Sequence, residues 1–317
     1  MSDTFCPAPW IGMFYHTNSA SVCCVNREKL KVSPSEFRNT AYVQNLKKDF
    51  LDGIKPESCF SCWKAEDAGL QSIRQHMLKN QYDLKSGYKH MELRASNLCN
   101  FQCIMCNAED SSEIAKEVRS ITEDNWIEIL EIAKDLKTLI LTGGEPMIIK
   151  RYYDLLEYLN EDTRLIIFTN CSVYNPKFVD RMMRLKNVKL QLSIDGVEET
   201  AERQRKGSDW EIVKQNAVAF CKLPIDISVH ATITKYNIID VSRFADFLLE
   251  LYEVNDKITA NAHTVVWPES MRFMKLNDDE IETATNQIDL AVSKLSHPNF
   301  NNLTKELSSL KRKLLGA

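Results

Sequence analysis

A short segment with three cysteines constrains this chain more than any other part of its sequence. Residues 99–106 read Cys-Asn-Phe-Gln-Cys-Ile-Met-Cys, which places Cys99, Cys103 and Cys106 within eight residues. Thiols at this CxxxCxxC spacing can bind three irons of one 4Fe-4S cluster and leave the fourth iron without a protein ligand. A structural zinc site needs four closed ligands, and no histidine lies nearby to complete one. The spacing therefore predicts an iron-sulfur site with one iron open to chemistry.

The remaining cysteines also lie mostly near the N-terminus. Eight of the ten cysteines precede residue 107, and only Cys171 and Cys221 follow it. Disulfides require an oxidising compartment, and the first ten residues lack the charged and apolar regions of an export signal. Clustered thiols in a reducing compartment favour metal binding. We therefore expect a cytoplasmic metalloprotein.

Length and charge exclude several other classes of protein. A chain of 317 residues has room for one large domain and a small appendage. Its formal net charge of −4 argues against general nucleic-acid binding, which normally requires a strongly basic balance. No apolar run approaches the roughly 18 residues that a membrane helix needs, so we expect no membrane contact.

From about residue 86, strands alternate with helices, which predicts βαβ units and a parallel sheet. The expected strands are residues 88–95, 138–142, 164–169, 188–194, 225–234 and 258–267. The expected helices are residues 111–119, 123–136, 151–159, 176–185, 210–221, 241–252, 278–293 and 302–315. Six strand-helix units are fewer than the eight that close a full (β/α)8 barrel.

By the same sequence patterns, residues 1–85 are expected to form an irregular, cysteine-bearing segment. Residues 5–10 are too rich in proline for a helix, and residues 19–25 resemble half of a hairpin. A short helix is expected within residues 35–52. Cys59 and Cys62 form a CxxC pair that can point at one metal, and a helix is expected over residues 66–78.

Chemistry in a parallel barrel is expected where the strands end, because the loops there converge over the barrel mouth. The second strand is followed by Thr-Gly-Gly-Glu-Pro at residues 142–146. Two glycines let the backbone approach a ligand closely, and the carboxylate could accept a hydrogen bond from an ammonium group. An ordinary turn is the alternative interpretation of this segment.

The CxxxCxxC segment after the first strand, with Gly-Gly-Glu-Pro after the second, resembles the radical SAM enzymes. The resemblance implies a partial, six-stranded barrel, so that the expected fold class is α/β, a partial (β/α)6 TIM-like barrel with a small cysteine-rich N-terminal module. It also implies that S-adenosylmethionine (SAM) occupies the open iron. By the same resemblance Met105 is the apolar residue before the third cysteine, and the SAM amino group binds at Gly143, Gly144, Glu145 and Pro146.

Three further strand-end residues and one arginine are similar to the family's SAM contacts. The third strand ends at Asn170, which could present its amide to the ligand, and the fourth ends at a Ser-x-Asp-Gly segment with Ser193 and Asp195 near the ribose. Arg205 resembles an arginine that pairs with the SAM carboxylate, a bond for which a planar guanidinium is well suited. A strand-end turn and a solvated charge are the alternatives.

The N-terminal cysteines resemble the auxiliary-cluster modules called SPASM and twitch. Five thiols, Cys6, Cys23, Cys24, Cys59 and Cys62, are available for four ligand positions, so Cys23 and Cys24 compete for one of them. A second 4Fe-4S cluster is the favoured interpretation, and a structural zinc or free thiols are the alternatives.

Four other residues of metal-binding or redox type have structural interpretations. Cys171 could donate a hydrogen atom or act as an extra ligand, but a small buried thiol is the favoured interpretation. Cys221 is expected in the core. His230 and His263 lie on expected strands and could reach the cavity, although structural roles are favoured for both.

The resemblance implies an enzyme that cleaves SAM reductively to a 5′-deoxyadenosyl radical and removes a hydrogen atom from a peptide or another substrate of similar size. A non-catalytic iron-sulfur or zinc scaffold is the alternative. The expected electron donor is a flavodoxin or ferredoxin, and no leader-binding winged helix is expected before Cys6. The expected division is an auxiliary module (1–85), a radical SAM barrel (86–270) and C-terminal helices (271–317).

Overall fold

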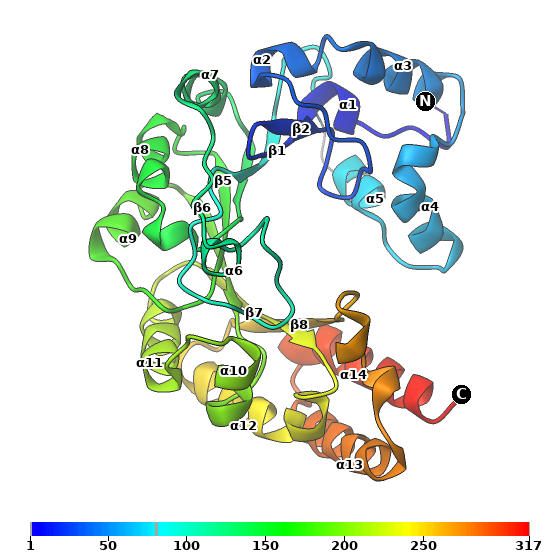
Figure 1. Ribbon diagram of the computed structural model, residues 1–317, viewed down its shortest axis with the longest axis vertical. Coiled ribbons are helices and arrows are strands. Elements are labelled where there is room, and N and C mark those ends of the chain that lie inside the picture. Colours follow the sequence, from blue (N-terminus) through cyan, green and yellow to red (C-terminus); the bar gives the residue numbers. More distant parts are fainter. Residues whose placement is uncertain (1, 80–81, 317) are drawn as a thin grey trace.

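A single open sheet organises the structure, which is a computed structural model describing residues 2–79 and 82–316 (Figure 1). The sheet has eight strands in the order β2-β1-β3-β4-β5-β6-β7-β8. Neighbours from β1 to β8 are parallel, and β2 pairs antiparallel with β1. The strands are β1 (Gly12–His16), β2 (Ser19–Ser21), β3 (His90–Arg94), β4 (Thr138–Leu141), β5 (Arg164–Thr169), β6 (Asn187–Ser193), β7 (Asp226–Ile233) and β8 (Thr259–Thr264).

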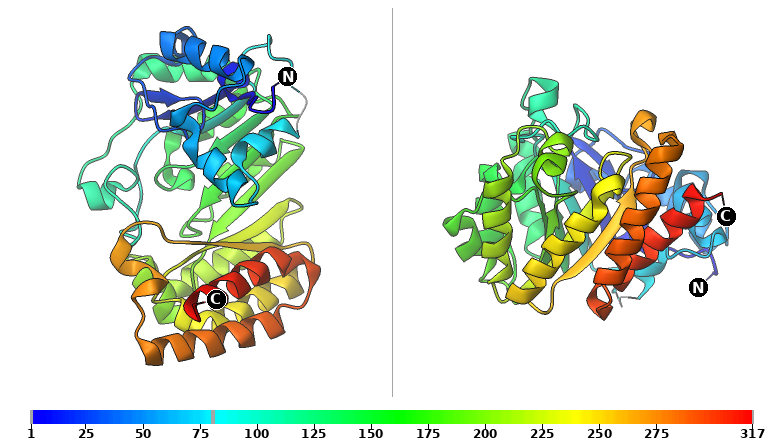
Figure 2. Two further views of the ribbon diagram at one scale, coloured as in Figure 1. Left: turned by 90° about the vertical axis from the view of Figure 1, so that its right-hand side faces the viewer. Right: turned by 90° about the horizontal axis from the view of Figure 1, so that it is seen from below.

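Alternating side chains give the sheet two different faces. In β5, Leu165 and Ile167 are buried against the helices, whereas Ile166 and Phe168 are half-buried on the opposite, concave side, which we call the inner face. Residues 73–77 of the N-terminal segment lie in the wall of a cavity on the inner face. The outer face is covered by helices (Figure 2). They are α7 (Glu123–Ala133), α8 (Lys150–Tyr158), α9 (Pro176–Met182), α10 (Glu198–Gln204), α11 (Trp210–Cys221), α12 (Val241–Val254), α13 (Asp278–Lys294) and α14 (Asn301–Leu314).

The six expected parallel strands are confirmed as β3 to β8, and the sheet is an open, partial barrel. One difference from the sequence prediction is that the sheet continues into the N-terminal segment. Residues Gly12 to His16 pair in register with His90 to Arg94, so β1 is a seventh parallel strand. All five residues of β1 are buried, and the strand therefore lacks the polar-apolar alternation by which strands are recognised. The proposed boundary near residue 85 stays a prediction, and the sheet crosses it.

Several helices also differ from expectation. The proline-rich start does form a short helix, α1 (Ala8–Ile11), because Pro7 and Pro9 occupy its first turn, where no amide hydrogen is needed. The single helix expected over residues 66–78 is two, α4 (Phe60–Asp67) and α5 (Ile73–Leu78), with Gly69 at φ +71° between them. The helix expected over 111–119 is only α6 (Ser112–Ala115), and α10 was not expected.

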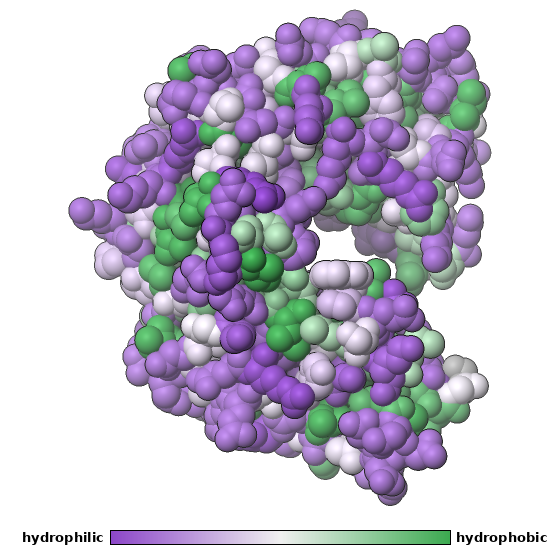
Figure 3. All heavy atoms as spheres, in the orientation of Figure 1, coloured by the Kyte–Doolittle hydropathy of each residue, from purple (hydrophilic) through white to green (hydrophobic). Residues whose placement is uncertain are grey.

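The remaining N-terminal helices, α2 (Pro34–Phe37) and α3 (Ala41–Leu51), lie with α1 beyond the β1 edge of the sheet (Figure 1). The C-terminal helices α13 and α14 lie at the β8 end, so the molecule has the outline of a letter C around the inner face. A deep notch separates the two ends in the space-filling view (Figure 3). None of the helices in residues 2–79 and 82–316 combines the length and apolar character needed to cross a bilayer.

Candidate active site

The candidate site is a cavity of about 1490 Å³ where the inner face meets the carboxyl ends of β3 to β7. We call it the strand-end cavity. Most residues singled out in the sequence line it: Cys99, Cys103, Met105, Cys106, Gly143, Gly144, Glu145, Asn170, Ser193 and Arg205. Pro146 and Asp195 do not line it. Pro146 begins a 3-10 turn behind the cavity wall, and Asp195 lies buried behind Arg205.

Backbone hydrogen bonds hold the three-cysteine loop against the segment after α10. The amide of Gln102 donates to the carbonyl oxygen of Lys206 at 2.8 Å, and the amide of Ile104 donates to that of Gln204 at 2.9 Å. On the other side of the loop, the Ser111 hydroxyl donates to the carbonyl oxygen of Phe101 at 2.7 Å. The loop is therefore fixed by its backbone, and its thiols remain free to face the cavity.

Burial strongly disfavours the ionised form of these thiols. It raises the pKa of Cys99 to about 12 and that of Cys106 to about 11. Burial also raises the pKa of Cys103, although the adjacent Arg205 guanidinium opposes the shift. Because a thiolate is the form that binds metal, a bound cation is needed to stabilise the three thiolates here. This donor set fits the iron-sulfur cluster that the spacing predicts.

The two glycines after β4 permit a close approach between parts of the chain itself. A β-carbon at Gly144 would collide with the carbonyl oxygen of Leu98, and one at Gly143 would lie 2.8 Å from that of Ser96. Gly143 also has φ +103°, a conformation that L side chains rarely adopt. The amide of Gly144 donates to Ser96 at 3.1 Å. The glycines thus allow this loop to pack closely against the residues that precede Cys99. The sequence alone did not indicate this role.

Glu145 is buried, and its carboxylate accepts three hydrogen bonds from within the protein. The donors are the amide of Met147 at 3.0 Å, the hydroxyl of Thr169 at 2.9 Å and the amide of Asn170 at 2.7 Å. Burial nevertheless raises the pKa of Glu145 to about 7. The Asn170 side chain in turn donates to the Asn100 side-chain oxygen at 3.1 Å. Glu145 therefore joins the end of β5 to the cysteine loop, and its contact with SAM stays a prediction.

Asp195 and Arg205 form a buried ion pair behind the cysteine loop. The Arg205 Nε lies 2.7 Å from the Asp195 carboxylate, and the side chains are 14% and 0% exposed. Asp195 also accepts from the amide of Thr232 at 2.7 Å. The paired guanidinium lies beside Cys103 and contributes positive charge there. Whether Arg205 also binds the SAM carboxylate stays a prediction.

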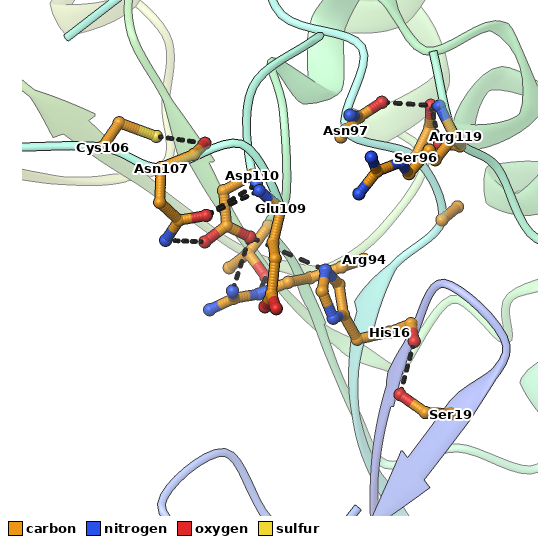
Figure 4. Close-up of polar contacts among 12 residues, drawn as sticks. His16, Ser19, Arg94, Ser96, Asn97, Cys106, Asn107, Glu109, Asp110 and Arg119 are labelled. Carbon is orange, nitrogen blue, oxygen red and sulfur yellow. Dashed lines mark hydrogen bonds and ion pairs between the residues drawn. The ribbon is translucent and has the colours of Figure 1, made fainter. Parts of the chain in front are cut away.

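A polar network that the sequence analysis missed joins the cysteine loop to β1 and β3 (Figure 4). The Arg94 guanidinium lies 2.7 Å from Asp110 and 3.7 Å from Glu92, and His16 lies 3.7 Å from Asp110. Asn107, directly after Cys106, donates to Asp110 at 3.3 Å. The signal was the alternation in β3, where Glu92 and Arg94 occupy successive positions of the inner face.

Residues 93–248 match the family described as "Radical SAM superfamily". These residues form a radical SAM domain. The match begins in β3 and ends in α12, so it includes the cysteine loop and the ends of β3 to β7. The family implies a 4Fe-4S cluster and SAM at this site.

The radical SAM domain is also similar to individual proteins. The sporulation killing factor maturation protein SkfB of Bacillus subtilis is 28% identical over 156 residues, which are 47% of this chain and 37% of that protein. The chain aligns with about two-fifths of the length of the curated relatives it matches.

Two solved structures support the fold. One, titled native anSMEcpe with bound AdoMet (that is, SAM), has a TM-score of 0.51 at 17% identity, over 67% of this chain and 62% of that chain. Streptococcus suis SuiB bound to precursor peptide SuiA has a TM-score of 0.50 at 17% identity, over 92% of this chain and 71% of that chain. At this identity the likeness concerns the fold, and it confirms the partial barrel.

Beside the radical SAM domain, four N-terminal thiols line a separate cavity of about 380 Å³. They are Cys6, Cys23, Cys59 and Cys62. Trp63 and Phe50 make the surroundings largely apolar, and burial raises the pKa of Cys23 to about 12. Three separate segments supply these thiols, so their convergence could not be read from spacing alone.

Two polar groups accompany these thiols. The Arg74 guanidinium forms an ion pair with Glu66 at 2.6 Å and lies close enough to Cys6 and Cys62 for its charge to act on them. The side-chain amide of Asn26 donates to the sulfur of Cys59 at 3.5 Å. A buried cation and an amide donor suit an anionic group bound by thiolates.

Cys24 points away from these four thiols. It lines the strand-end cavity of the radical SAM domain, and Glu92 lies close enough to raise its pKa further by charge and hydrogen bonding. In the described part of the chain, no three Cys, His, Asp or Glu side chains converge as ligands of one metal ion. A four-iron cluster binds its thiolates through separate irons, and therefore needs thiols arranged around a shared cavity and not around one metal ion.

The remaining candidates lie outside the strand-end cavity of the radical SAM domain. Cys171 and Cys221 are buried, as favoured from the sequence, and Cys171 has φ +61°. His230 and His263 lie side by side on β7 and β8, with 2.6 Å between Nε2 of the first and Nδ1 of the second. Burial lowers the pKa of His230 to about 4. A structural role for each stays a prediction.

Proposed function

We propose that this chain is a radical SAM enzyme that acts on a peptide or on another substrate of similar size. The observation that carries the proposal is the shared cavity: three thiols of one loop line the same space as the ends of five neighbouring parallel strands. When bound, the cluster and SAM supply a 5′-deoxyadenosyl radical that removes a hydrogen atom from the substrate. A non-catalytic scaffold would not need this arrangement.

The chain's own residues hold and shield these groups. Cys99, Cys103 and Cys106 would ligate three irons, and the Arg205 guanidinium beside Cys103 would offset part of the thiolate charge. Gly143 and Asn170 lie on the cavity wall, where backbone and amide groups could orient SAM. We assign the same role to Met105, Gly144, Glu145 and Ser193, which also line the cavity. Pro146 and Asp195, predicted as SAM contacts from the sequence, do not line it, so we assign them an indirect role, Asp195 through its ion pair with Arg205. The strand-end cavity lies on the concave inner face, where a bound substrate would help to exclude water and stray hydrogen donors.

A peptide is the favoured substrate class. SkfB is named as a maturation protein of a killing factor, and SuiB was solved with a precursor peptide. The strand-end cavity continues into a second cavity of about 1470 Å³ along the inner face, with Cys24, Glu92 and Ile140 in both walls. The two adjoining cavities run from the amino ends to the carboxyl ends of the strands, which supports an extended substrate.

We further propose that Cys6, Cys23, Cys59 and Cys62 hold an auxiliary 4Fe-4S cluster. Their common cavity, with the Arg74 cation and the Asn26 amide beside it, supports an anionic cluster. Cys23 also borders the second cavity, so this site would face the substrate space. A structural zinc at the same thiols remains the alternative that metal analysis must distinguish.

The division into an auxiliary module (1–85), a barrel (86–270) and C-terminal helices (271–317) belongs to this proposal. An electron donor of the flavodoxin or ferredoxin class would reduce the first cluster. Residue 1, residues 80–81 and residue 317 lie outside the described residues.

Anaerobic reconstitution followed by metal analysis and mass spectrometry tests these proposals. Two four-iron clusters require about eight irons per chain. Reduction with dithionite in the presence of SAM should then release 5′-deoxyadenosine. Four irons and one zinc would replace the auxiliary cluster by a zinc site. Full iron sites without nucleoside release would contradict the enzymatic proposal.

A further inference from the structure

The second cavity, which we call the lower cavity, lies along the inner face near the amino ends of β3 to β6. Its wall includes Lys137 and Arg164 together with His76 and His90. Lys189 occupies the inner face beside them, because its register partner is Ile166, which lines the same cavity. Lys137, Arg164 and Lys189 therefore form a cationic group, which we call the lower cations, on three neighbouring segments.

Strand alternation shows that Arg164 and Lys189 face inward, and Lys137, just before β4, borders the same cavity. Arg164, Ile166 and Phe168 share one side of β5, and Phe168 lines the strand-end cavity. On β6, Lys189 shares its side with Ser193, which also lines the strand-end cavity. The lower cations and the cysteine loop thus belong to one continuous surface.

No carboxylate in residues 2–79 and 82–316 lies within ion-pair distance of any lower cation. The two carboxylates in the cavity wall are already paired: Asp162 lies 2.9 Å from Lys186, and Glu92 lies 3.7 Å from Arg94. The Nε of Arg164 is buried and has no hydrogen-bond partner in this part of the chain. Arg164 and Lys189 are half-buried and Lys137 is exposed. Polar groups that are removed from water are normally found with a partner, so the buried Nε of Arg164 favours a bound acceptor.

The lower cations also act on one another. The pKa of Lys189 is lowered, first by burial and then by the nearby charge of Arg164, and only Asp226 opposes the shift. Two cations that repel each other across a partly dry cavity would both be stabilised by a shared anion. His90 does not supply a further fixed charge, because burial lowers its pKa to about 4.

We propose that the lower cavity binds an anionic group of the substrate, a carboxylate or a phosphate, between Arg164, Lys189 and Lys137. This inference rests on the proposed function and adds a requirement for the substrate. Phe168, at the strand-end cavity, lies four residue steps along β5 from Arg164, or about 13 Å at ~3.3 Å per residue. The anion therefore lies several residues of an extended peptide away from the atom that reacts.

Calorimetric titration of the anaerobically reconstituted protein tests this site. The probes are inorganic phosphate and N-acetylaspartate, each added at constant ionic strength and without reductant. We expect at least one probe to bind, with tenfold or greater weakening in Arg164→Gln and in Lys189→Gln. Arg164→Lys, which keeps the charge, should recover most of the affinity. Lys222→Gln removes an exposed lysine at the end of α11 and should bind like the wild type.

Each outcome has a defined meaning. Tighter binding of phosphate indicates a phosphorylated substrate, and tighter binding of N-acetylaspartate indicates an acidic peptide. Failure of both probes on the wild type, or equal binding by all variants with unchanged melting temperatures, overturns the inference. Because no SAM cleavage occurs without reductant, this result is independent of nucleoside release. A protein that binds the anion but never forms 5′-deoxyadenosine would contradict only the proposed function.

Discussion

The two groups of thiols differ in how the chain assembles them. Cys99, Cys103 and Cys106 come from one loop of eight residues beside a cavity of about 1490 Å³. The N-terminal thiols come from three separate segments and enclose a largely apolar space of about 380 Å³. Three ligands beside an open space suit a site that must admit a second molecule, whereas four ligands around a small space suit a closed one.

The two groups also share a feature, because each has a buried arginine held by a carboxylate. Arg205 pairs with Asp195 beside Cys103, and Arg74 pairs with Glu66 near Cys6 and Cys62. The Asp195 side chain is fully buried, whereas 16% of the Glu66 side chain is exposed. Both thiol groups therefore lie near a positive charge, and the ion pair beside the cysteine loop has the more deeply buried carboxylate.

Replacing a thiol of the loop should have the largest effect. Cys103→Ala should abolish 5′-deoxyadenosine release and lower the iron content from about eight to about four per chain. Cys221→Ala is the control, since that thiol is buried away from both cavities. Loss of all iron in Cys103→Ala would mean that the two groups of thiols do not form independent sites.

Removing the charge of Asp195 should cost the most stability. Asp195→Asn leaves the Arg205 guanidinium buried and unpaired, which typically costs about 3–5 kcal/mol. Urea unfolding monitored by circular dichroism measures the change. Glu250→Gln breaks an exposed pair with Lys214 and should cost no more than about 1 kcal/mol. Equal losses of unfolding free energy in the two variants would show that the buried pair contributes no more stability than the exposed pair.

Replacing a thiol of the N-terminal group should separate radical formation from metal content. Cys62→Ala should lose about four irons and still release 5′-deoxyadenosine at a rate within several-fold of the wild type, because the three loop thiols are intact. Turnover of a substrate should be lost. Iron analysis and mass spectrometry measure both quantities. Unchanged iron with loss of one zinc would identify the closed site as a zinc site.

Glu145 and Glu66 should respond to pH in different ways, because the pKa of Glu145 is raised and that of Glu66 is lowered. The raised pKa of Glu145, about 7, means that its folded form binds an extra proton above the ~4.3 of an unfolded glutamate. Stability should therefore fall as pH rises from 5.5 to 7, by at most about 1.4 kcal/mol per pH unit.

Urea unfolding at several pH values compares the wild type with two variants. Arg74 lowers the pKa of Glu66 below its value in the unfolded chain. The contribution of Glu66 to stability is therefore fully present above the unfolded pKa and stays constant between pH 5.5 and 7. Relative to Glu145→Gln, the wild type should lose stability as pH rises, whereas relative to Glu66→Gln it should not. If the unfolding free energies of all three proteins changed with pH in the same way, the expected difference between Glu145 and Glu66 would be contradicted.

The smallest effect is expected at Cys24. It faces the strand-end cavity and not the closed thiol group, so Cys24→Ala should retain about eight irons, whereas Cys23→Ala should lose about four. Anaerobic iron analysis compares the two adjacent variants directly. Loss of iron in Cys24→Ala would reverse our choice of ligand.

Local patterns were sufficient to predict the barrel and the cysteine loop. The strands β3 to β8 alternate with helices, and β5 and α11 begin and end at the expected residues. Residues that act through distant partners could not be predicted. Gly144 approaches Leu98, Arg205 reaches Asp195, and Arg164 lacks a partner only because of what folds around it. Such contacts depend on register and packing, which periodicity does not encode.

The parallel pairing of β1 with β3 has a consequence for synthesis. The partner of Gly12 is His90, so the first strand leaves the ribosome long before the strand that it must join. Such long-range pairing closes slowly. Until β3 emerges, the segments carrying Cys6, Cys23 and Cys59 lack the sheet edge that orders them. We expect the closed thiol group to acquire its metal only after the barrel has begun to fold.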